Sequence, residues 1–116
     1  DGVFAVRHTV LDRIGALRAA GFRTALLTNS FREFRDHLEQ HIDFGLFDEV
    51  IDSSEVACRK PEPEIYRLTT ERMGCPAEEI LYLDDFMANV EGARAAGWQA
   101  VHVTGEADVL AAIAGL

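Results

Sequence analysis

The feature that most constrains the fold is a regular alternation of short apolar segments with longer amphipathic ones along the 116 residues. Apolar side chains at helical spacing predict a helix over 10–20, and Gly21 is typical of a helix end. A buried apolar run then predicts a strand over 22–28. The same alternation predicts helices at 31–40, 63–73, 88–96 and 107–114 and strands at 47–51, 80–83 and 99–103. Strands that alternate with helices predict one α/β domain, in which helices cover both faces of a mainly parallel sheet.

The charge balance limits the partners of the protein. The chain has 20 Asp and Glu residues against 11 Lys and Arg residues, which gives a net charge of −9. Nucleic acids and anionic membrane surfaces are bound through basic patches, so this composition argues against both. A small anionic substrate is compatible with it if the few basic side chains gather at the site. The sequence does not reveal an oligomeric state.

The cysteines and the apolar segments bear on the compartment. Cys58 and Cys75 have neither zinc-site spacing nor C-x-x-C spacing. We interpret them as free thiols in a reducing environment. The sequence shows neither a signal-peptide core nor an apolar run long enough to cross a bilayer. We therefore expect a cytoplasmic protein.

Polar residues follow the first predicted strand, where ligands of open parallel sheets bind. Thr28, Asn29 and Ser30 lie at this strand end. Ser30 and Glu33 have the spacing of a helix-capping box, so one interpretation is that they only start the next helix. The other is that a hydroxyl, an amide and a helix N-terminus converge to bind an anion. This stretch alone leaves both interpretations open.

A basic residue follows the second predicted strand. Lys60 precedes Pro61, so its backbone is expected to be extended, with the ammonium group pointing out of the loop. A single lysine is usually solvated. Lys60 becomes a candidate because it can reach the same edge of the sheet as Thr28 and Asn29.

Two adjacent carboxylates follow the third predicted strand. Asp84 and Asp85 come directly after the apolar run 80–83. Desolvating both would raise the pKa of at least one, whereas a hard cation would remove this cost. Mg²⁺ uses one or two protein carboxylates and completes its coordination with phosphate and water. Because successive strand residues point to opposite faces, we expect only one of the two to bind the metal directly and the other to orient a ligand or a loop. We favour Asp85 as the direct ligand. Asn89, one turn into the next helix, can contact the same loop.

The polar residues that follow the three predicted strands, and their order along the chain, resemble the motifs of the haloacid dehalogenase-like hydrolases. "LLTNS" is similar to the second motif of that family, "RKPEPEIY" to the third, and "LYLDD" with Asn89 to the fourth. The phosphatase domain of soluble epoxide hydrolases is the most similar subgroup. The resemblance implies a Rossmann-like α/β/α core, Mg²⁺ and an aspartyl-phosphate intermediate. The resemblance implies that Thr28, Asn29 and Lys60 bind phosphate. It implies that Lys60, Asp84 and Asp85 are catalytic and that Asp84 and Asp85 also form the metal site. Ser30 and Asn89 would support these residues.

One element of the family pattern is missing. The first family motif, D-x-D, supplies the nucleophile from the central strand, and no D-x-D occurs in this sequence. Either Asp1-Gly2-Val3 is the tail of such a motif, or "FAVRHTVLDRI" is the segment that follows a cap domain, in which case the motif and the cap both lie upstream. We interpret residues 1–116 as a partial core domain and expect the chain alone to be inactive, because charge stabilisation does not replace an attacking carboxylate. The missing strand would lie between the strands that end at Thr28 and Leu83 and would leave two strand edges exposed.

Three functions remain in competition. The first is the C-terminal part of a magnesium-dependent phosphatase that acts on a small phosphomonoester. The second is a non-catalytic remnant or binding module that keeps the fold without the nucleophile. The third is a 2-haloacid dehalogenase, whose chemistry needs no metal, so the Asp84–Asp85 pair argues for the phosphatase. His102 has no partner that the sequence reveals.

Overall fold

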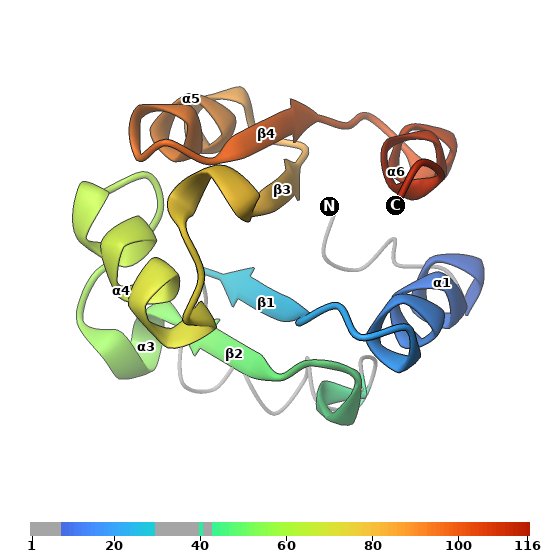
Figure 1. Ribbon diagram of the computed structural model, residues 1–116. Coiled ribbons are helices and arrows are strands. Elements are labelled where there is room, and N and C mark those ends of the chain that lie inside the picture. The colour runs from blue at the N-terminus through green and yellow to red at the C-terminus, as the bar shows by residue number, and fades with distance from the viewer. Residues whose placement is uncertain (1–7, 30–39, 41–42) are drawn as a thin grey trace.

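The computed structural model describes residues 8–29, 40 and 43–116, and these residues form an α/β fold (Figure 1). The strands are β1 (Ala25–Thr28), β2 (Glu49–Asp52), β3 (Leu81–Asp84) and β4 (Gln99–His102). The helices are α1 (His8–Ala19), α3 (Ser53–Val56), α4 (Pro63–Met73), α5 (Met87–Ala95) and α6 (Glu106–Ile113), with the 3-10 turns η1 (Phe44–Leu46) and η2 (Ala77–Glu79). Within these ranges, none of the helices combines the length and the apolarity that a membrane span requires.

Most element boundaries agree closely with the sequence prediction. α4 begins and ends at the predicted residues. The largest shift is in the first strand, which starts at Ala25 instead of residue 22. α3 was not predicted; it is one turn long, and the Asp52 carboxylate caps it by accepting a hydrogen bond from Ser54 N at 2.9 Å. The helix expected at 31–40 and the capping residues Ser30 and Glu33 lie outside the described residues.

The strands form two parallel pairs. β1 pairs with β2 from Ala25 opposite Glu49 to Thr28 opposite Asp52. β3 pairs with β4 from Leu81 opposite Gln99 to Asp84 opposite His102. Among the described residues, β1 and β3 share no ladder. Within the described residues, the expected single sheet is therefore present as two halves, which face each other at the position where the sequence analysis expects a strand to be missing.

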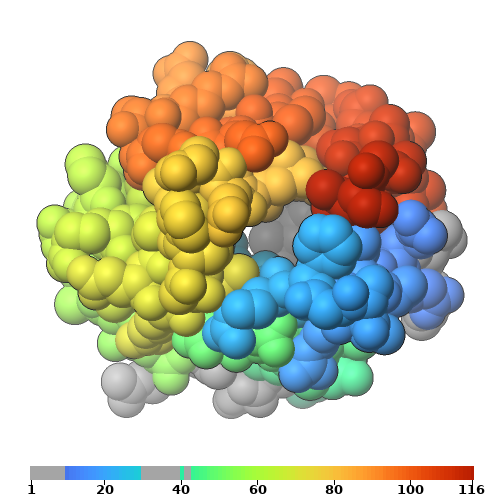
Figure 2. Space-filling model, in the orientation of Figure 1, coloured from blue at the N-terminus to red at the C-terminus, as the bar shows by residue number. Residues whose placement is uncertain are grey.

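Helix contacts join the two halves on either side. α4 contacts both β2 and α5, and α1 contacts α6 (Figure 1). Between these helix pairs, the space-filling view shows a hollow bordered by the α1–β1 segment, η2 and α6 (Figure 2). The carboxyl ends of β1 and β3 come close enough together for one side chain, that of Lys60, to contact both, although the two strands are not hydrogen-bonded to each other.

The core is centred on α4. Ile65 and Tyr66 of this helix are completely buried and lie in one cluster with Ile51 of β2, Val90 of α5 and Trp98. The cluster includes residues of both halves, so hydrophobic burial links them where backbone pairing does not. The Tyr66 and Trp98 rings pack edge to face with their centroids 5.2 Å apart, a favourable aromatic arrangement.

Gly92 is expected to be required for the contact between α4 and α5. A Cβ added at Gly92 would lie 2.9 Å from both the Cε2 and the hydroxyl oxygen of the buried Tyr66 side chain and 3.1 Å from Pro61 Cβ. We predict that Gly92→Ala lowers the free energy of unfolding by about 1–3 kcal/mol, because overpacking a fixed ring outweighs the gain in helix propensity. Denaturant unfolding measures this change. Gly115→Ala, which places a Cβ in open space, is the control; equal stability of the two variants would contradict the steric explanation.

Candidate functional site

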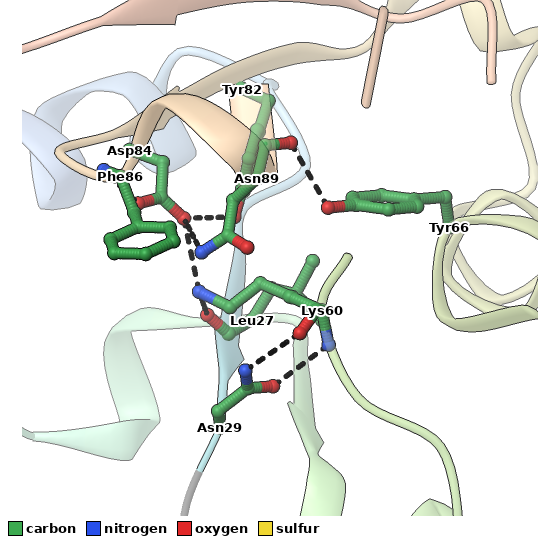
Figure 3. Close-up of polar contacts among 8 residues, drawn as sticks. All are labelled: Leu27, Asn29, Lys60, Tyr66, Tyr82, Asp84, Phe86 and Asn89. Carbon is green, nitrogen blue, oxygen red and sulfur yellow. Dashed lines mark hydrogen bonds and ion pairs between the residues drawn. The ribbon is translucent and has the colours of Figure 1, made fainter. Parts of the chain in front are cut away.

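The candidate site is centred on Lys60, which bridges the two halves of the fold (Figure 3). Its Nζ donates hydrogen bonds to the Leu27 carbonyl of β1 at 3.2 Å and to Asp84 Oδ2 of β3 at 3.0 Å. The side chains of Lys60 and Asp84 are only 12% and 7% exposed, so this ion pair is largely shielded from water. The Lys60 ammonium also lies 5.9 Å from the centroid of the Tyr82 ring, within cation–π range. The prediction that the ammonium points out of its loop towards the strand ends is confirmed.

The backbone of Lys60 is fixed by the residue that follows Thr28. Asn29 Nδ2 donates to the Lys60 carbonyl at 3.0 Å, and Lys60 N donates to Asn29 Oδ1 at 2.9 Å. The Lys60–Pro61 peptide is cis. Glu62 does not cap α4 with its side chain; its carboxylate accepts a hydrogen bond from Arg59 N at 2.8 Å and closes the loop instead. The Asn29 amide is thus engaged in orienting Lys60, and its predicted contact with phosphate stays a prediction.

Asp84 is the most heavily hydrogen-bonded carboxylate of the site. Oδ2 accepts from Lys60, from Asn89 Nδ2 at 3.1 Å and from the Tyr82 hydroxyl, while Oδ1 accepts from Phe86 N at 2.8 Å. Burial raises the pKa of Asp84, but the Lys60 charge and the hydrogen bonds of Tyr82, Phe86 and Lys60 together hold the pKa below its ordinary value. Because its pKa is lowered in the folded state, the ionised Asp84 carboxylate stabilises the fold at pH values above the ordinary pKa of aspartate. This stabilisation is lost as the pH falls through the lowered pKa.

Two tyrosines support this network and were not predicted from the sequence. Burial and the hydrogen bond to Asp84 raise the pKa of Tyr82, so the hydroxyl stays protonated and donates. Tyr66 donates to the Asn89 carbonyl at 3.0 Å, and burial raises its pKa to about 12. Tyr82 precedes Asp84 by two residues, so the strand period places both side chains on one face. That period is a signal that would have identified Tyr82.

Asp85 differs from Asp84 in exposure and in hydrogen bonding. Asp85 is exposed, and among the described residues its carboxylate has no hydrogen-bond partner. His102 Nε2 lies 3.0 Å from the Asp85 backbone carbonyl. No group of three or more His, Cys, Asp or Glu side chains that would hold a metal comes together in the part of the chain that the structure describes. A Mg²⁺ ion does not need such a group, because phosphate and water complete its coordination.

Thr28 carries the one buried side-chain polar atom that lacks a partner within the described ranges. The residue is 3% exposed, and its Oγ1 makes no hydrogen bond. Burying a hydroxyl without a partner costs about 1–3 kcal/mol, so such a group is expected to serve a ligand. Thr28 ends β1 directly after Leu27, whose carbonyl accepts from Lys60. The structure therefore brings together six of the seven predicted residues, Thr28, Asn29, Lys60, Asp84, Asp85 and Asn89, while the seventh, Ser30, lies outside the described residues.

These features agree with comparisons to known proteins. The model of a protein family described as haloacid dehalogenase-like hydrolase matches residues 2–97. The chain therefore belongs to the haloacid dehalogenase-like hydrolases, as the motifs indicate.

The relatives are longer proteins. The chain is 30% identical over 116 residues to the bifunctional epoxide hydrolase 2 of Rattus norvegicus. This match covers 91% of this chain and 20% of the relative. The chain is also 34% identical over 105 residues to a phosphoglycolate phosphatase of Salmonella paratyphi A. That match covers 90% of this chain and 41% of the relative. The chain thus spans less than half the length of these curated relatives.

A solved structure confirms the fold. A haloacid dehalogenase family enzyme of Bacteroides thetaiotaomicron, solved in complex with magnesium and inorganic phosphate, superimposes with a TM-score of 0.78 at 23% identity. The match covers 86% of this chain and 54% of that enzyme. At this level of identity the likeness establishes the Rossmann-like fold, which agrees with the predicted fold class.

Proposed function

We propose that residues 1–116 are the C-terminal part of a magnesium-dependent phosphatase core, which hydrolyses a small phosphomonoester through an aspartyl-phosphate. The nucleophilic aspartate would lie outside these residues, since the sequence contains no D-x-D. The observation that carries the proposal is the buried Thr28 hydroxyl, which has no partner among the described residues and lies at the end of the strand that Lys60 contacts. Within the described part of the chain, two of the three Lys60 ammonium protons are engaged, which would leave one for a phosphate oxygen. The phosphatases among the relatives support this substrate class.

The carboxylates fit a Mg²⁺ ion unequally. Asp85 offers an exposed carboxylate with no hydrogen-bond partner among the described residues, as a hard cation requires. Asp84 is engaged with four donors, so we assign it to orienting Lys60 and the loop at the metal site. When bound, Mg²⁺ would neutralise charge on the transferring phosphoryl group.

The residues of this chain would act by binding and charge stabilisation. Lys60 would balance the negative charge between phosphate and nucleophile, and Asp84 would keep its ammonium group in place. Thr28 would donate to a phosphoryl oxygen, and Asn29 would bind the same group or hold the Lys60 backbone. None of these groups attacks phosphorus, because nucleophilic attack needs a carboxylate positioned in line.

A non-catalytic binding module is the second candidate, and the absence of D-x-D favours it. To separate the two, the 116-residue chain and the full-length protein are each assayed with p-nitrophenyl phosphate and Mg²⁺. We expect no turnover by the chain and magnesium-dependent turnover by the full-length protein. Turnover by the chain would contradict a nucleophile outside it. Magnesium binding without turnover in the full-length protein would favour the binding module.

Thr28 can be tested separately by its effect on stability. We predict that Thr28→Val raises the free energy of unfolding by about 1 kcal/mol, because it removes an unsatisfied buried hydroxyl, and that it weakens the binding of inorganic phosphate. Thr24→Val is the matched control, since the Thr24 hydroxyl donates to the Leu46 carbonyl at 2.7 Å and its removal should destabilise the fold. A loss of stability in Thr28→Val as large as in Thr24→Val would show that the Thr28 hydroxyl serves the fold and not a ligand.

A further inference from the structure

His102 connects the end of β4 to the loop that follows β3. Its Nε2 lies 3.0 Å from the Asp85 backbone carbonyl. A carbonyl oxygen only accepts hydrogen bonds, so Nε2 carries a proton and donates it. The contact joins residues that are 17 positions apart and that come together because His102 lies opposite Asp84 in the β3–β4 ladder.

The same strand end fixes two successive carbonyls of the loop. Val103 N donates to the Asp84 carbonyl at 3.0 Å, and His102 holds the Asp85 carbonyl beside it. On the other side, Phe86 N donates to Asp84 Oδ1 at 2.8 Å. The peptide units on both sides of the Asp85 side chain are therefore fixed, while its carboxylate stays exposed and without a partner among the described residues.

Apolar packing does little to hold this loop. Phe86 is 62% exposed and Met87 is 40% exposed, although both are large apolar side chains. The position of the loop therefore depends on polar contacts, of which the His102 contact is the one that acts on Asp85 itself. Loss of that contact would leave the Asp85–Phe86 peptide held only from its N–H side, by the Phe86 N–Asp84 Oδ1 hydrogen bond, and would widen the range of orientations of the Asp85 carboxylate.

We propose that His102 is a positioning residue for the metal site: by holding the Asp85 peptide, it presents the Asp85 carboxylate to a divalent cation. The inference rests on the proposed function, which assigns Asp85 as the metal ligand. His102 would touch neither the metal nor the substrate. It would act through the backbone of its neighbour, as residues that orient a ligand commonly do.

Mn²⁺ is a suitable probe, because it replaces Mg²⁺ and broadens the NMR signals of nearby amides. The full-length protein is labelled with ¹⁵N, and Mn²⁺ is titrated while the amides of residues 85–87 are observed. We expect His102→Ala to weaken Mn²⁺ binding about 3- to 10-fold, which corresponds to the loss of one hydrogen bond. His102→Gln keeps a side-chain N–H donor and is expected to recover most of the affinity.

The chain offers a matched control at the other end of the same strand. Gln99 Nε2 donates to the Glu78 carbonyl at 2.7 Å, so it is also an exposed side chain that holds a backbone carbonyl. Gln99→Ala is expected to bind Mn²⁺ as the unaltered protein does. Unchanged Mn²⁺ affinity in His102→Ala, or an equal loss in Gln99→Ala, would overturn the inference.

A second readout separates this inference from the proposed function. If Asp85→Asn binds Mn²⁺ as well as the unaltered protein, the proposed metal site is wrong, whatever His102 does. Hydrogen exchange of the Phe86 amide without metal then tests the positioning role alone. A rate that rises about 3- to 10-fold in His102→Ala but not in Gln99→Ala supports that role. A rate unchanged in His102→Ala overturns it.

Discussion

Lys60→Met is expected to lower the free energy of unfolding by about 3–5 kcal/mol at pH 7, because it leaves the buried Asp84 carboxylate without its cation. The methionine keeps much of the length and apolar surface of the lysine stem, so the loss reports mainly on the charge. Asp84 would keep its hydrogen bonds from Tyr82, Asn89 and Phe86, which do not supply a positive charge. Urea unfolding of the two proteins gives the difference directly.

The pH dependence of this loss has a definite sign. With Lys60 present, the pKa of Asp84 is lowered, so the carboxylate stabilises the fold above about pH 4. Without Lys60, burial of Asp84 is opposed only by its remaining hydrogen bonds, so the pKa of Asp84 is expected to be higher in the variant than in the unaltered protein, and protonation destabilises the folded variant less. The difference in unfolding free energy between the two proteins is therefore expected to shrink as the pH falls from 7 towards 4.

Arg67→Met is the control for the loss of one positive charge. Arg67 forms ion pairs with Glu64 and Glu71 at 2.8 and 2.7 Å, but all three side chains are more than half exposed. Exposed ion pairs contribute little, so this variant is expected to unfold almost as the unaltered protein does. If Lys60→Met were no less stable than Arg67→Met, the buried ion pair would not contribute to holding the two halves of the fold together.

Asp85→Asn is expected to reduce kcat/KM of the full-length protein by about 10²-fold or more and to abolish its dependence on magnesium. The reason is that the exposed Asp85 carboxylate is the proposed metal ligand, and a neutral amide binds Mg²⁺ poorly. Its effect on stability should be small, because the carboxylate makes no hydrogen bond within the described part of the chain. Steady-state kinetics across a magnesium titration measure both changes.

Asp12→Asn makes the same change of charge on the exposed surface of α1 and serves as the control. It is expected to leave both kcat/KM and the magnesium dependence unchanged. Kinetics of Asp85→Asn that match those of Asp12→Asn would remove Asp85 from the metal site. If Asp85→Asn loses its activity because it no longer folds, Asp85 has a structural role. That result would contradict the assignment of metal binding to Asp85 and of the stabilising contacts to Asp84.

Much of the fold and of the site could be predicted because both depend on local patterns. The apolar spacing and Gly74 placed α4 at 63–73, and Gly74 adopts the left-handed conformation that ends the helix. The residues at the strand ends could be named because parallel strands end at one edge of a sheet. Glu62 occupies the N-cap position of α4, but its carboxylate accepts from Arg59 N and not from the helix, a contact that the sequence pattern does not reveal.

The sequence by itself determined the order of the elements, the residues at the strand ends and the family. Only the tertiary structure decided how these residues divide their roles. Lys60 meets Leu27 and Asp84 across 33 and 24 positions of the chain, and His102 meets Asp85 across 17. The Lys60 contacts depend on how the two strand pairs face each other, which α4 fixes by packing against both halves. The His102 contact depends on the β3–β4 ladder, in which His102 lies opposite Asp84. For that reason two adjacent aspartates of identical chemistry differ: Asp84 is buried and paired with Lys60, whereas Asp85 is exposed and its carboxylate makes no hydrogen bond to the described residues.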